Sequence, residues 1–520
     1  MIVGLSAFFF LAANFLNFTT PRLFNSPDET THFVFIDHFA RTSKLALSQP
    51  YSYGQYSSFI FPRSTVAVQE EIRPVGFWGL NVMYGFLAKI IGSQSIVFVT
   101  PLLTLLAGAC FFCIIKKIFS RLVAKWSTVL FFMQPAIWYY TARSLFPNLP
   151  FLFLLLLGLY LLYCRPFDSL TASYHLPAQN DFFGLTSILM ALLIRPSEVW
   201  WIGIIFLFIF WQYRPSFTAR RIFIGTILFA LTLIVYVKVT KTLFPGELIG
   251  YTASHSFTIN HWYQFIFPFG LELKTILLTT WQYGVKLLWW LTFPTLIGFF
   301  IFVKQWKQAG RPKIQTTYMF ITLGVSLFLL LFYGSFFDPH FYLFSIGVAY
   351  SRYFLPLFVV SIPFLVLGLY GLTNFLPAKF QKFGFAWLIA LIFLLNFRLV
   401  FLGDDGLFSV AENIRHGAFV RQWVTDNTPP ASIILTDAED KFFWPERQVM
   451  VNSFQPDILQ AVIGLLTQGQ SLYYFAPLPK LDESKDLASR FSAVGIDLKP
   501  SRYFPPHVLY SLSLLNSSTK

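Results

Sequence analysis

Charged residues are scarce in this chain, and their scarcity excludes most soluble folds. Asp, Glu, Lys and Arg make up 12% of the 520 residues, which is about half the share usual in soluble domains. Hydrophobic residues reach 56%, aromatic residues 20%, and the mean hydropathy is +0.60. A soluble protein has too little interior to bury so much apolar surface. The composition therefore indicates a polytopic α-helical membrane protein.

Cysteine is also rare, and this excludes a disulfide framework. The three cysteines, Cys110, Cys113 and Cys164, lie in or beside apolar stretches. Cys110 and Cys113 form a C-x-x-C with no second pair, so we interpret them as small buried hydrophobes and not as a metal or redox site. A P-loop and a glycine-rich dinucleotide motif are absent, and the histidines are scattered. We therefore expect no metal site and no required cofactor, although a divalent metal is chemically compatible.

Apolar stretches of about 20 residues recur as far as residue 402, and each is long enough to predict a membrane helix. The first lacks a basic leader and a small-residue cleavage site, so we interpret it as a retained helix. The eleven predicted helices cover residues 2–20, 95–115, 127–142, 149–164, 182–195, 198–213, 222–240, 284–303, 317–333, 353–372 and 384–402.

The net charge of +14 is the excess of 38 Lys and Arg over 24 Asp and Glu, and many of the basic residues lie in every second connection between these helices. They are Lys116, Lys117, Arg121, Lys125, Arg165, Arg214, Arg220, Arg221, Lys304, Lys307, Arg311, Lys313, Lys379 and Lys382. By the positive-inside rule these loops and the N-terminus are cytoplasmic, and an odd number of helices places the C-terminus outside. Because no basic run or nucleic-acid fold signature occurs, no nucleic-acid partner is expected.

Two segments on the predicted outer side have structure of their own. In residues 21–94, an amphipathic helix with Phe33, Ile36 and Phe39 on one face precedes an apolar helix at 76–92, and we expect both helices to lie along the membrane interface. After Gly403 the charge density becomes that of a soluble domain. The tail is expected to form strands at 432–436, 448–451 and 471–475 and helices at 408–427 and 455–468. This divides the chain into a membrane domain, 1–402, and a small extracytoplasmic α/β domain, 403–520.

The most specific local motif is Ser26-Pro27-Asp28-Glu29, directly after the first predicted helix. A helix start explains all four residues, with Ser26 as N-cap, Pro27 in the first turn and the two acids near the positive end of the dipole. A catalytic site explains them equally well, because ionisable groups at a membrane surface are costly and are functional candidates by default. Composition and pattern leave both interpretations open.

Further charged residues are expected in the same outer layer. The stretch 70–74, with Glu71 and Arg73, is either a solvated loop whose ion pair is worth less than about 1 kcal/mol or part of a site. Arg143, Arg195 and Arg352 lie at outer ends of apolar helices. One such Arg commonly anchors a helix at the interface, whereas several on one face would bind phosphate. The acidic stretch 437–440 is interpreted as a loop cap and not as a metal motif.

The order of these motifs resembles the polytopic GT-C glycosyltransferases that use polyprenyl-phosphate sugars, especially the protein-O-mannosyltransferase-like and aminoarabinose-transferase-like group. Asn148 stands where that family often has Asp, which weakens the match of a second acid. The motifs that carry the resemblance are Asp28-Glu29 with His32 and Phe33, Glu71-Ile72-Arg73-Pro74 with Phe77-Trp78, Tyr140-Thr141-Ala142-Arg143 with Pro147-Asn148, Leu193-Ile194-Arg195-Pro196, and Ser351-Arg352-Tyr353-Phe354-Leu355-Pro356.

The resemblance implies a GT-C fold and transfer of a sugar, mannose-like or another hexose or pentose, from a polyprenyl phosphate to a hydroxyl of a glycan, lipid or protein. Asp28 would be the general base and Glu29 its catalytic neighbour. A single displacement would invert the anomeric carbon. The remaining implied residues are Arg352, Arg73, Arg143 and Arg195 for the donor phosphate, and His32, Glu71 and Tyr353 for substrate binding.

Two other functional classes remain open from the sequence. A lipid-linked sugar flippase or transporter would suit broken apolar helices and buried arginines, although no internal repeat is evident. A non-catalytic membrane scaffold would present the outer α/β domain to a partner. The chain's compactness favours a prokaryotic plasma membrane. The outer loops 241–283 and 335–352 are expected to set the specificity for the donor.

Overall fold

The computed structural model describes residues 2–20, 23–75, 78–163, 178–213, 219–243, 266–309, 312–336, 345–347, 349–479 and 481–515. The chain forms two compact units. The first, here the helical unit, comprises Met1–Thr19, Val97–Val239 and Phe257–Val410. The second, here the mixed unit, comprises Thr20–Ile96, Thr240–Ser256 and Ala411–Lys520. Of the segments discussed above, about half of each loop expected to set specificity lies outside the described residues, as do Cys164, Arg165, Arg214, Arg311 and Phe77.

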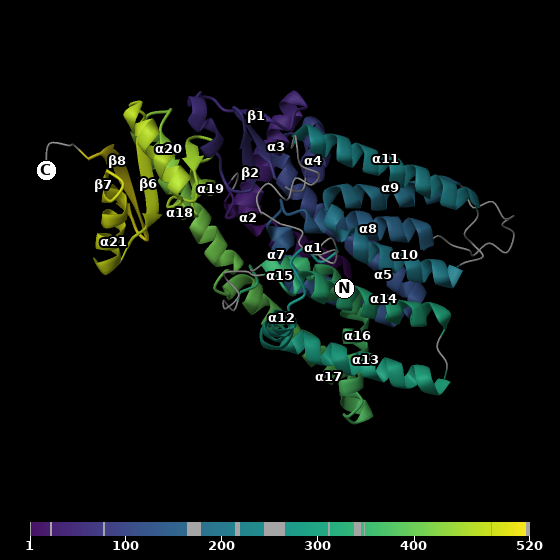
Figure 1. Ribbon diagram of the computed structural model, residues 1–520. Coiled ribbons are helices and arrows are strands. Elements are labelled where there is room, and N and C mark those ends of the chain that lie inside the picture. The colour runs from purple at the N-terminus through teal and green to yellow at the C-terminus, as the bar shows by residue number, and fades with distance from the viewer. Residues whose placement is uncertain are drawn as a thin grey trace. The chain divides into compact units, whose positions relative to one another are not determined.

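The helical unit consists of apolar helices that pack against their neighbours. Helices α5, α8 and α9 pack in succession, α10 packs on α14, and α13 packs on α16; Figure 1 shows several of these helices running side by side. Its helices are α1 (Ile2–Ala13), α2 (Phe15–Thr19), α5 (Val99–Ile118), α6 (Arg121–Met133), α7 (Pro135–Ala142), α8 (Asn148–Tyr163), α9 (Ala178–Ile194), η3 (Pro196–Glu198), α10 (Val199–Tyr213), α11 (Ala219–Leu243, ending in the mixed unit), α12 (Leu273–Thr279), η7 (Thr280–Leu287), α13 (Trp289–Ala309), α14 (Lys313–Tyr333), α15 (Ala349–Tyr353), α16 (Leu355–Thr373) and α17 (Ala378–Leu402).

All eleven predicted membrane segments contain helix, but prolines interrupt some of them. The segment predicted at 127–142 breaks between α6 and α7, because Pro135 lacks the N–H that a continuous helix needs and instead starts a new helix capped by Gln134. Helices α9 and α10 are bent by 119° at a break that includes Arg195. Within the described ranges, five helices are long and apolar enough to cross a membrane, or seven if each bent pair counts as one span. The chain is an integral membrane protein, and several of its predicted spans are short or broken.

Helices α13 and α16 approach so closely that only glycine fits between them. A Cβ on Gly298 would lie 1.8 Å from the backbone oxygen of Phe364, and a Cβ on Gly368 would lie 1.8 Å from the backbone oxygen of Pro294. Small residues at such crossings allow backbones to pack directly, which is a main source of helix association in membranes.

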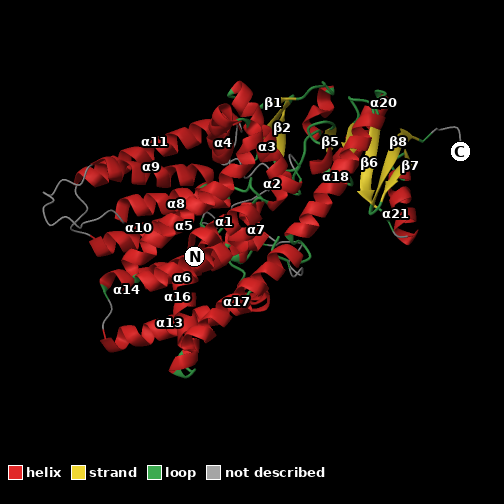
Figure 2. Ribbon diagram, turned by 180° about the vertical axis from the view of Figure 1, so that it is seen from behind, coloured by secondary structure: helices red, strands yellow, loops and turns green. Residues whose placement is uncertain are grey.

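The strands among the described residues lie in the mixed unit and form two sheets (Figure 2). The small sheet is antiparallel in the order β1-β3-β2. The larger has the order β5-β4-β6-β8-β7, with β5, β4 and β6 parallel and the β7–β8 hairpin antiparallel. The elements of this unit are α3 (Pro27–Thr42), β1 (Leu47–Ser48), η1 (Gly54–Phe59), β2 (Thr65–Val68), β3 (Glu71–Pro74), α4 (Trp78–Ile91), η2 (Ser93–Phe98, ending in the helical unit), α18 (Leu407–Asn427, starting in the helical unit), β4 (Ile433–Leu435), α19 (Asp440–Phe443), β5 (Gln448–Met450), α20 (Pro456–Thr467), β6 (Leu472–Pro477), α21 (Leu481–Ser492), β7 (Ile496–Phe504) and β8 (His507–Leu514).

The mixed unit joins the first outer segment to the C-terminal segment through shared hydrophobic cores. Phe35 of α3 and Ile72 of β3 lie in one core with Trp444, and Tyr53 beside η1 lies in another with Ile433. The predicted boundary near residue 402 lies close to the division after residue 410, but the unit that follows also includes residues 20–96. Phe35 of α3 packs inside the mixed unit, and the position of α3 along the membrane interface stays a prediction.

Candidate active site

The mixed unit contains the predicted acidic pair at the start of α3. Ser26 has an extended backbone (φ −125°, ψ 143°), and its side chain accepts a hydrogen bond from the Asp28 N–H at 3.2 Å. Pro27 occupies the first turn, so the N-cap predicted from the sequence is present. Glu29 is 2% exposed, whereas Asp28 is only partly buried. Asp28 is therefore more exposed to solvent than Glu29.

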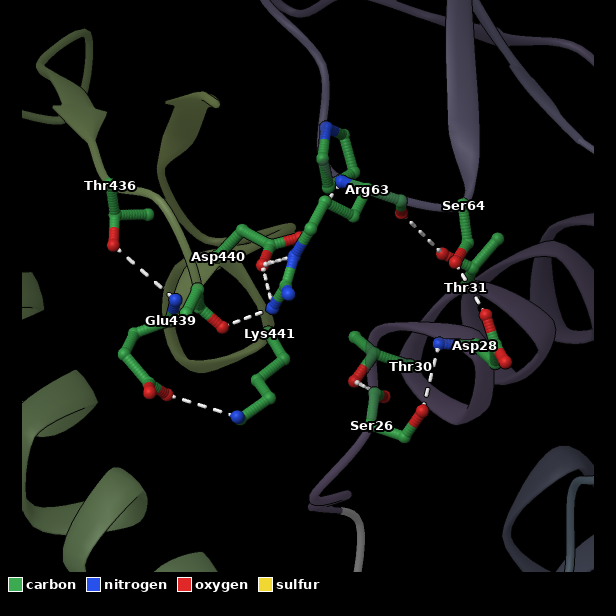
Figure 3. Close-up of polar contacts among 12 residues, drawn as sticks. Ser26, Asp28, Thr30, Thr31, Arg63, Ser64, Thr436, Glu439, Asp440 and Lys441 are labelled. Atoms are coloured by element: carbon green, nitrogen blue, oxygen red, sulfur yellow. Dashed lines mark hydrogen bonds and ion pairs between the residues drawn. The ribbon is translucent and has the colours of Figure 1, made fainter. Parts of the chain in front are cut away.

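A turn at Arg63 and Ser64 contacts this helix start (Figure 3). The Ser64 hydroxyl donates to Oδ1 of Asp28 at 2.5 Å, and Thr31 donates to the backbone oxygen of Arg63 at 3.4 Å. A hydrogen bond to a carboxylate stabilises its charged form. The sequence analysis missed Ser64, because nothing in the pattern links it to a residue 36 positions earlier.

The same turn is bound on its other side by α19 of the C-terminal segment (Figure 3). Oδ2 of Asp440 accepts from the Arg63 N–H at 2.8 Å, and Oδ1 accepts from Arg63 Nε at 2.7 Å. Asp440 is fully buried, and Arg63 also donates to the backbone oxygen of Ala438. The stretch 437–440, predicted as a loop cap, therefore also provides an ion pair across the unit.

His32 lies one helical turn after Asp28 and is buried. Its Nδ1 is 2.6 Å from Oδ1 of Asn81 on α4. An amide oxygen only accepts, so Nδ1 carries the hydrogen and Nε2 is the accepting nitrogen in the neutral ring. The contact fixes the ring orientation of a residue that the sequence predicts to bind substrate.

Glu71 and Arg73 lie on strand β3 and not in a loop, which was one of the two interpretations of this stretch. They are two residues apart and therefore share one face of the strand, where Arg73 and Glu71 form an ion pair at 2.7 Å. Arg73 also donates to the backbone oxygens of Leu243 at 2.7 Å and Thr242 at 3.2 Å. These contacts favour a role for Arg73 in joining β3 to the end of α11.

Two of the predicted arginines in the helical unit converge on one aromatic ring. The guanidinium carbons of Arg143 and Arg352 lie 5.0 Å and 5.1 Å from the centre of the Phe146 ring. Arg143 also donates to the Tyr139 hydroxyl at 3.1 Å, and Asn148 donates to the backbone oxygen of Arg352 at 3.0 Å. The ring thus brings two guanidinium groups close together, and guanidinium groups are well suited to bind phosphate.

Arg195 is in a different arrangement within the same unit. Its guanidinium pairs with Glu198 at 2.5 Å, and both side chains are nearly fully buried. Tyr333 donates to Glu198 at 3.1 Å, and the Tyr353 ring stacks on Tyr333 with centres 4.5 Å apart. Since Glu198 already provides the opposite charge, the geometry favours a structural role for Arg195. A carboxylate three residues after an Arg was the sequence signal that could have revealed this pair.

The residues that the structure describes include no group of three His, Cys, Asp or Glu side chains placed to hold a metal ion. The sequence-based expectation that no metal is required stays a prediction.

Comparisons with known proteins establish the fold. The chain matches no protein-family model and no curated protein sequence. Its structure is similar to ArnT from Cupriavidus metallidurans, with a TM-score of 0.59 and 13% identity over 98% of this chain and 97% of ArnT. It is also similar to the oligosaccharyltransferase of Archaeoglobus fulgidus. The apo form gives a TM-score of 0.51 at 11% identity over 95% of this chain and 71% of that protein. Its complex with Zn and sulfate gives 0.54 at 12% identity over 95% and 69%.

The chain therefore has the GT-C fold, as its sequence motifs predict. The match to ArnT extends over nearly the whole length of both chains.

Proposed function

We propose that this protein is an integral-membrane glycosyltransferase that moves a sugar from a polyprenyl phosphate to an acceptor hydroxyl on the extracytoplasmic face. The proposal rests on the position of Asp28 in a chain with the GT-C fold. Asp28 is partly buried at the start of α3, and its Oδ1 accepts a hydrogen bond from the Ser64 hydroxyl at 2.5 Å. Positioned carboxylates of this kind act as general bases.

Asp28 would take the proton of the acceptor hydroxyl as its oxygen attacks the anomeric carbon. The bond from that carbon to the phosphate oxygen breaks, and the bonding electrons leave with the polyprenyl phosphate. Attack opposite the leaving group inverts the anomeric configuration. General-base catalysis of this type contributes about 10²–10⁴-fold to the rate.

Arg143 and Arg352 are the groups best suited to the phosphate charge. Arg recognises phosphate through several donors at once, and charge that develops on a leaving group is stabilised by fixed cations. Their shared position at Phe146 supports this role. We assign Arg73 and Arg195 to structural ion pairs instead. Glu29 as catalytic neighbour, and His32, Glu71 and Tyr353 as substrate-binding residues, stay predictions.

Because the leaving group already carries the phosphate, the reaction needs no nucleotide. The acceptor is a hydroxyl of a glycan, a lipid or a protein, and the sugar is a hexose or pentose. The bilayer is the third partner, since it holds the donor's lipid chain. The inferred membrane is the prokaryotic plasma membrane, with a cytoplasmic N-terminus.

The test is transfer from radiolabelled undecaprenyl-phosphate mannose, glucose and arabinose in membranes that contain equal amounts of each variant. Wild type should move label into a glycoconjugate, and Asp28→Asn should lower the rate by about 10²–10⁴-fold. Asp37→Asn is the matched control, because Asp37 lies on the same helix and pairs with the exposed Arg41. Asp37→Asn should keep the wild-type rate.

Equal rates for Asp28→Asn and wild type would show that Asp28 is not the general base. Retention of the anomeric configuration in the product would contradict a single displacement. If wild type transfers from none of the donors but moves them across vesicle bilayers, the protein is a flippase.

A further inference from the structure

The turn formed by Arg63 and Ser64 links the C-terminal segment to the proposed base. On one side, Ser64 donates to Asp28 at 2.5 Å. On the other, Asp440 accepts from both the backbone and the side chain of Arg63, at 2.8 Å and 2.7 Å. Figure 3 shows the turn between α3 and α19, with these contacts on its two sides. The hydroxyl that reaches Asp28 is thus one residue away from an ion pair with a buried carboxylate.

The backbone at Ser64 is in a conformation that must be held in place. Its φ is +62°, in the left-handed region that residues other than glycine seldom adopt. The Ser64 carbonyl accepts from the Val75 N–H at 3.1 Å, and the Arg63 carbonyl accepts from Thr31. A glycine would adopt this backbone more easily than serine, but it has no hydroxyl. The contact with Asp28 is what the hydroxyl provides.

We propose that Ser64 is a positioning residue for Asp28, and that Asp440 of the C-terminal segment holds the turn that places Ser64. This inference rests on the proposed function, because it assumes that Asp28 is the base. Ser64 fixes the rotation of the carboxylate and stabilises its charged form. The carboxylate therefore stays ready to accept the acceptor's proton at lower pH than it would without the hydroxyl.

Ser64→Gly is the decisive variant, because it removes the hydroxyl and relieves the left-handed backbone. A folding defect is therefore not expected. A hydrogen bond to a charged group corresponds to about 10–100-fold in rate, so kcat should fall by that factor while KM for the lipid-linked donor stays unchanged. The acidic limb of the pH–rate profile should move to higher pH. A residue with only a structural role would produce neither the split between kcat and KM nor the shift of the profile.

Ser43→Gly is the matched control. Ser43 also has a left-handed backbone, with φ +61°, and its hydroxyl accepts from Lys89 at 2.6 Å, away from Asp28. Ser43→Gly should leave kcat, KM and the pH profile as in wild type. Ser64→Asn should restore part of kcat, since asparagine tolerates this backbone and keeps an N–H donor.

Asp440→Asn tests the second half of the inference. It should lower kcat in the same way as Ser64→Gly, and the double variant should be no slower than the slower single variant, because both act on one turn. If Asp440→Asn does not fold, Arg63→Lys replaces it, because lysine keeps the charge and the backbone N–H but loses Nε.

The outcomes separate this inference from the proposed function. If wild type is active and Asp28→Asn is not, but Ser64→Gly keeps the wild-type kcat and pH profile, then Ser64 does not position the base and the proposed function stands. If Asp28→Asn keeps the wild-type rate, the base assignment fails, and this inference fails with it. A fully additive double variant would overturn the role of Asp440.

Discussion

Arg195 and Glu198 form an ion pair inside the helical unit, with the guanidinium 2.5 Å from the carboxylate and both side chains at most 3% exposed. Tyr333 and Trp201 also donate to this carboxylate. Every charged group in the contact therefore has a partner of opposite charge or a hydrogen bond. The arrangement favours a structural role for Arg195.

Glu198→Gln should destabilise the protein without a specific effect on donor binding. It leaves the Arg195 charge buried without its counter-charge, which costs about 3–5 kcal/mol in comparable sites. Thermal unfolding in detergent measures the loss. Replacing both residues, as Arg195→Met with Glu198→Leu, should restore most of the stability. If the Glu198→Gln protein is stable but binds the donor poorly, then Arg195 contributes to binding of the donor phosphate and its assignment to a structural ion pair is wrong.

Arg352→Gln and Arg143→Gln should each lower kcat/KM for the lipid-linked donor by about 10²–10³-fold, which is typical when one group that stabilises developing charge is removed. Arg352→Lys should recover part of the activity, because it keeps the charge but loses the planar fork. Initial rates over a range of donor concentrations measure this. Arg41→Gln, at an exposed position on α3, is the control. Unchanged kcat/KM in both variants would place the phosphate elsewhere.

Gly298→Ala should destabilise the helical unit. Alanine normally improves a helix by about 1 kcal/mol relative to glycine, but here its methyl group would collide with the Phe364 carbonyl of α16. Overpacking of this kind costs about 1–3 kcal/mol. Gly203→Ala on α10, where the added methyl group meets nothing within 4 Å, is the matched control. Equal melting temperatures for the two variants would show that α13 and α16 separate easily.

The mixed unit should lose stability as the pH falls through about 6.5, the pKa of an unfolded histidine. Burial lowers the pKa of His507 in the folded chain; Glu439 partly opposes this, and His416 and Lys441 add to it. Below pH 6.5 the unfolded chain binds a proton that the folded chain binds less well, so acid favours unfolding. His507→Phe keeps an aromatic ring to stack on Phe475 but removes the group that binds the proton. The melting temperature of this variant should therefore fall less between pH 7.5 and 5.5 than that of wild type. An unchanged slope would assign the acid sensitivity to other groups.

The membrane helices were predictable because their signal is local. A run of apolar residues indicates a membrane helix without reference to the rest of the chain, but the break at Pro135 inside the segment predicted at 127–142 was missed. The N-cap at Ser26 and strands β4, β5 and β6 were found for the same reason. Strand β3 was missed, because its partners β1 and β2 are short and give no alternating pattern of their own.

The contacts of the candidate site were not predictable, because they join distant parts of the sequence. Arg63 and Asp440 are separated by 377 positions, and neither has a local pattern that points to the other. Asp28 was found through its place at a helix start, whereas Ser64 could be found only from the folded chain. The pair of Arg195 and Glu198 is the exception, because the two residues are three positions apart, but the burial of both side chains is visible only in the folded chain.

The cores shared by α3, β3 and the C-terminal segment also set an order of events during synthesis. Phe35 and Ile72 leave the ribosome early, yet they pack against Trp444 and Leu509, which are made hundreds of residues later. Domains usually fold as they emerge, the N-terminal one first, but here part of the core around the proposed base is completed last. Helix α3 packs on α4, which follows it closely in the chain, whereas Phe35 and Ile72 lack their C-terminal core partners until those residues have been translated. A prematurely ended chain would therefore lack this shared core and the contact between Arg63 and Asp440.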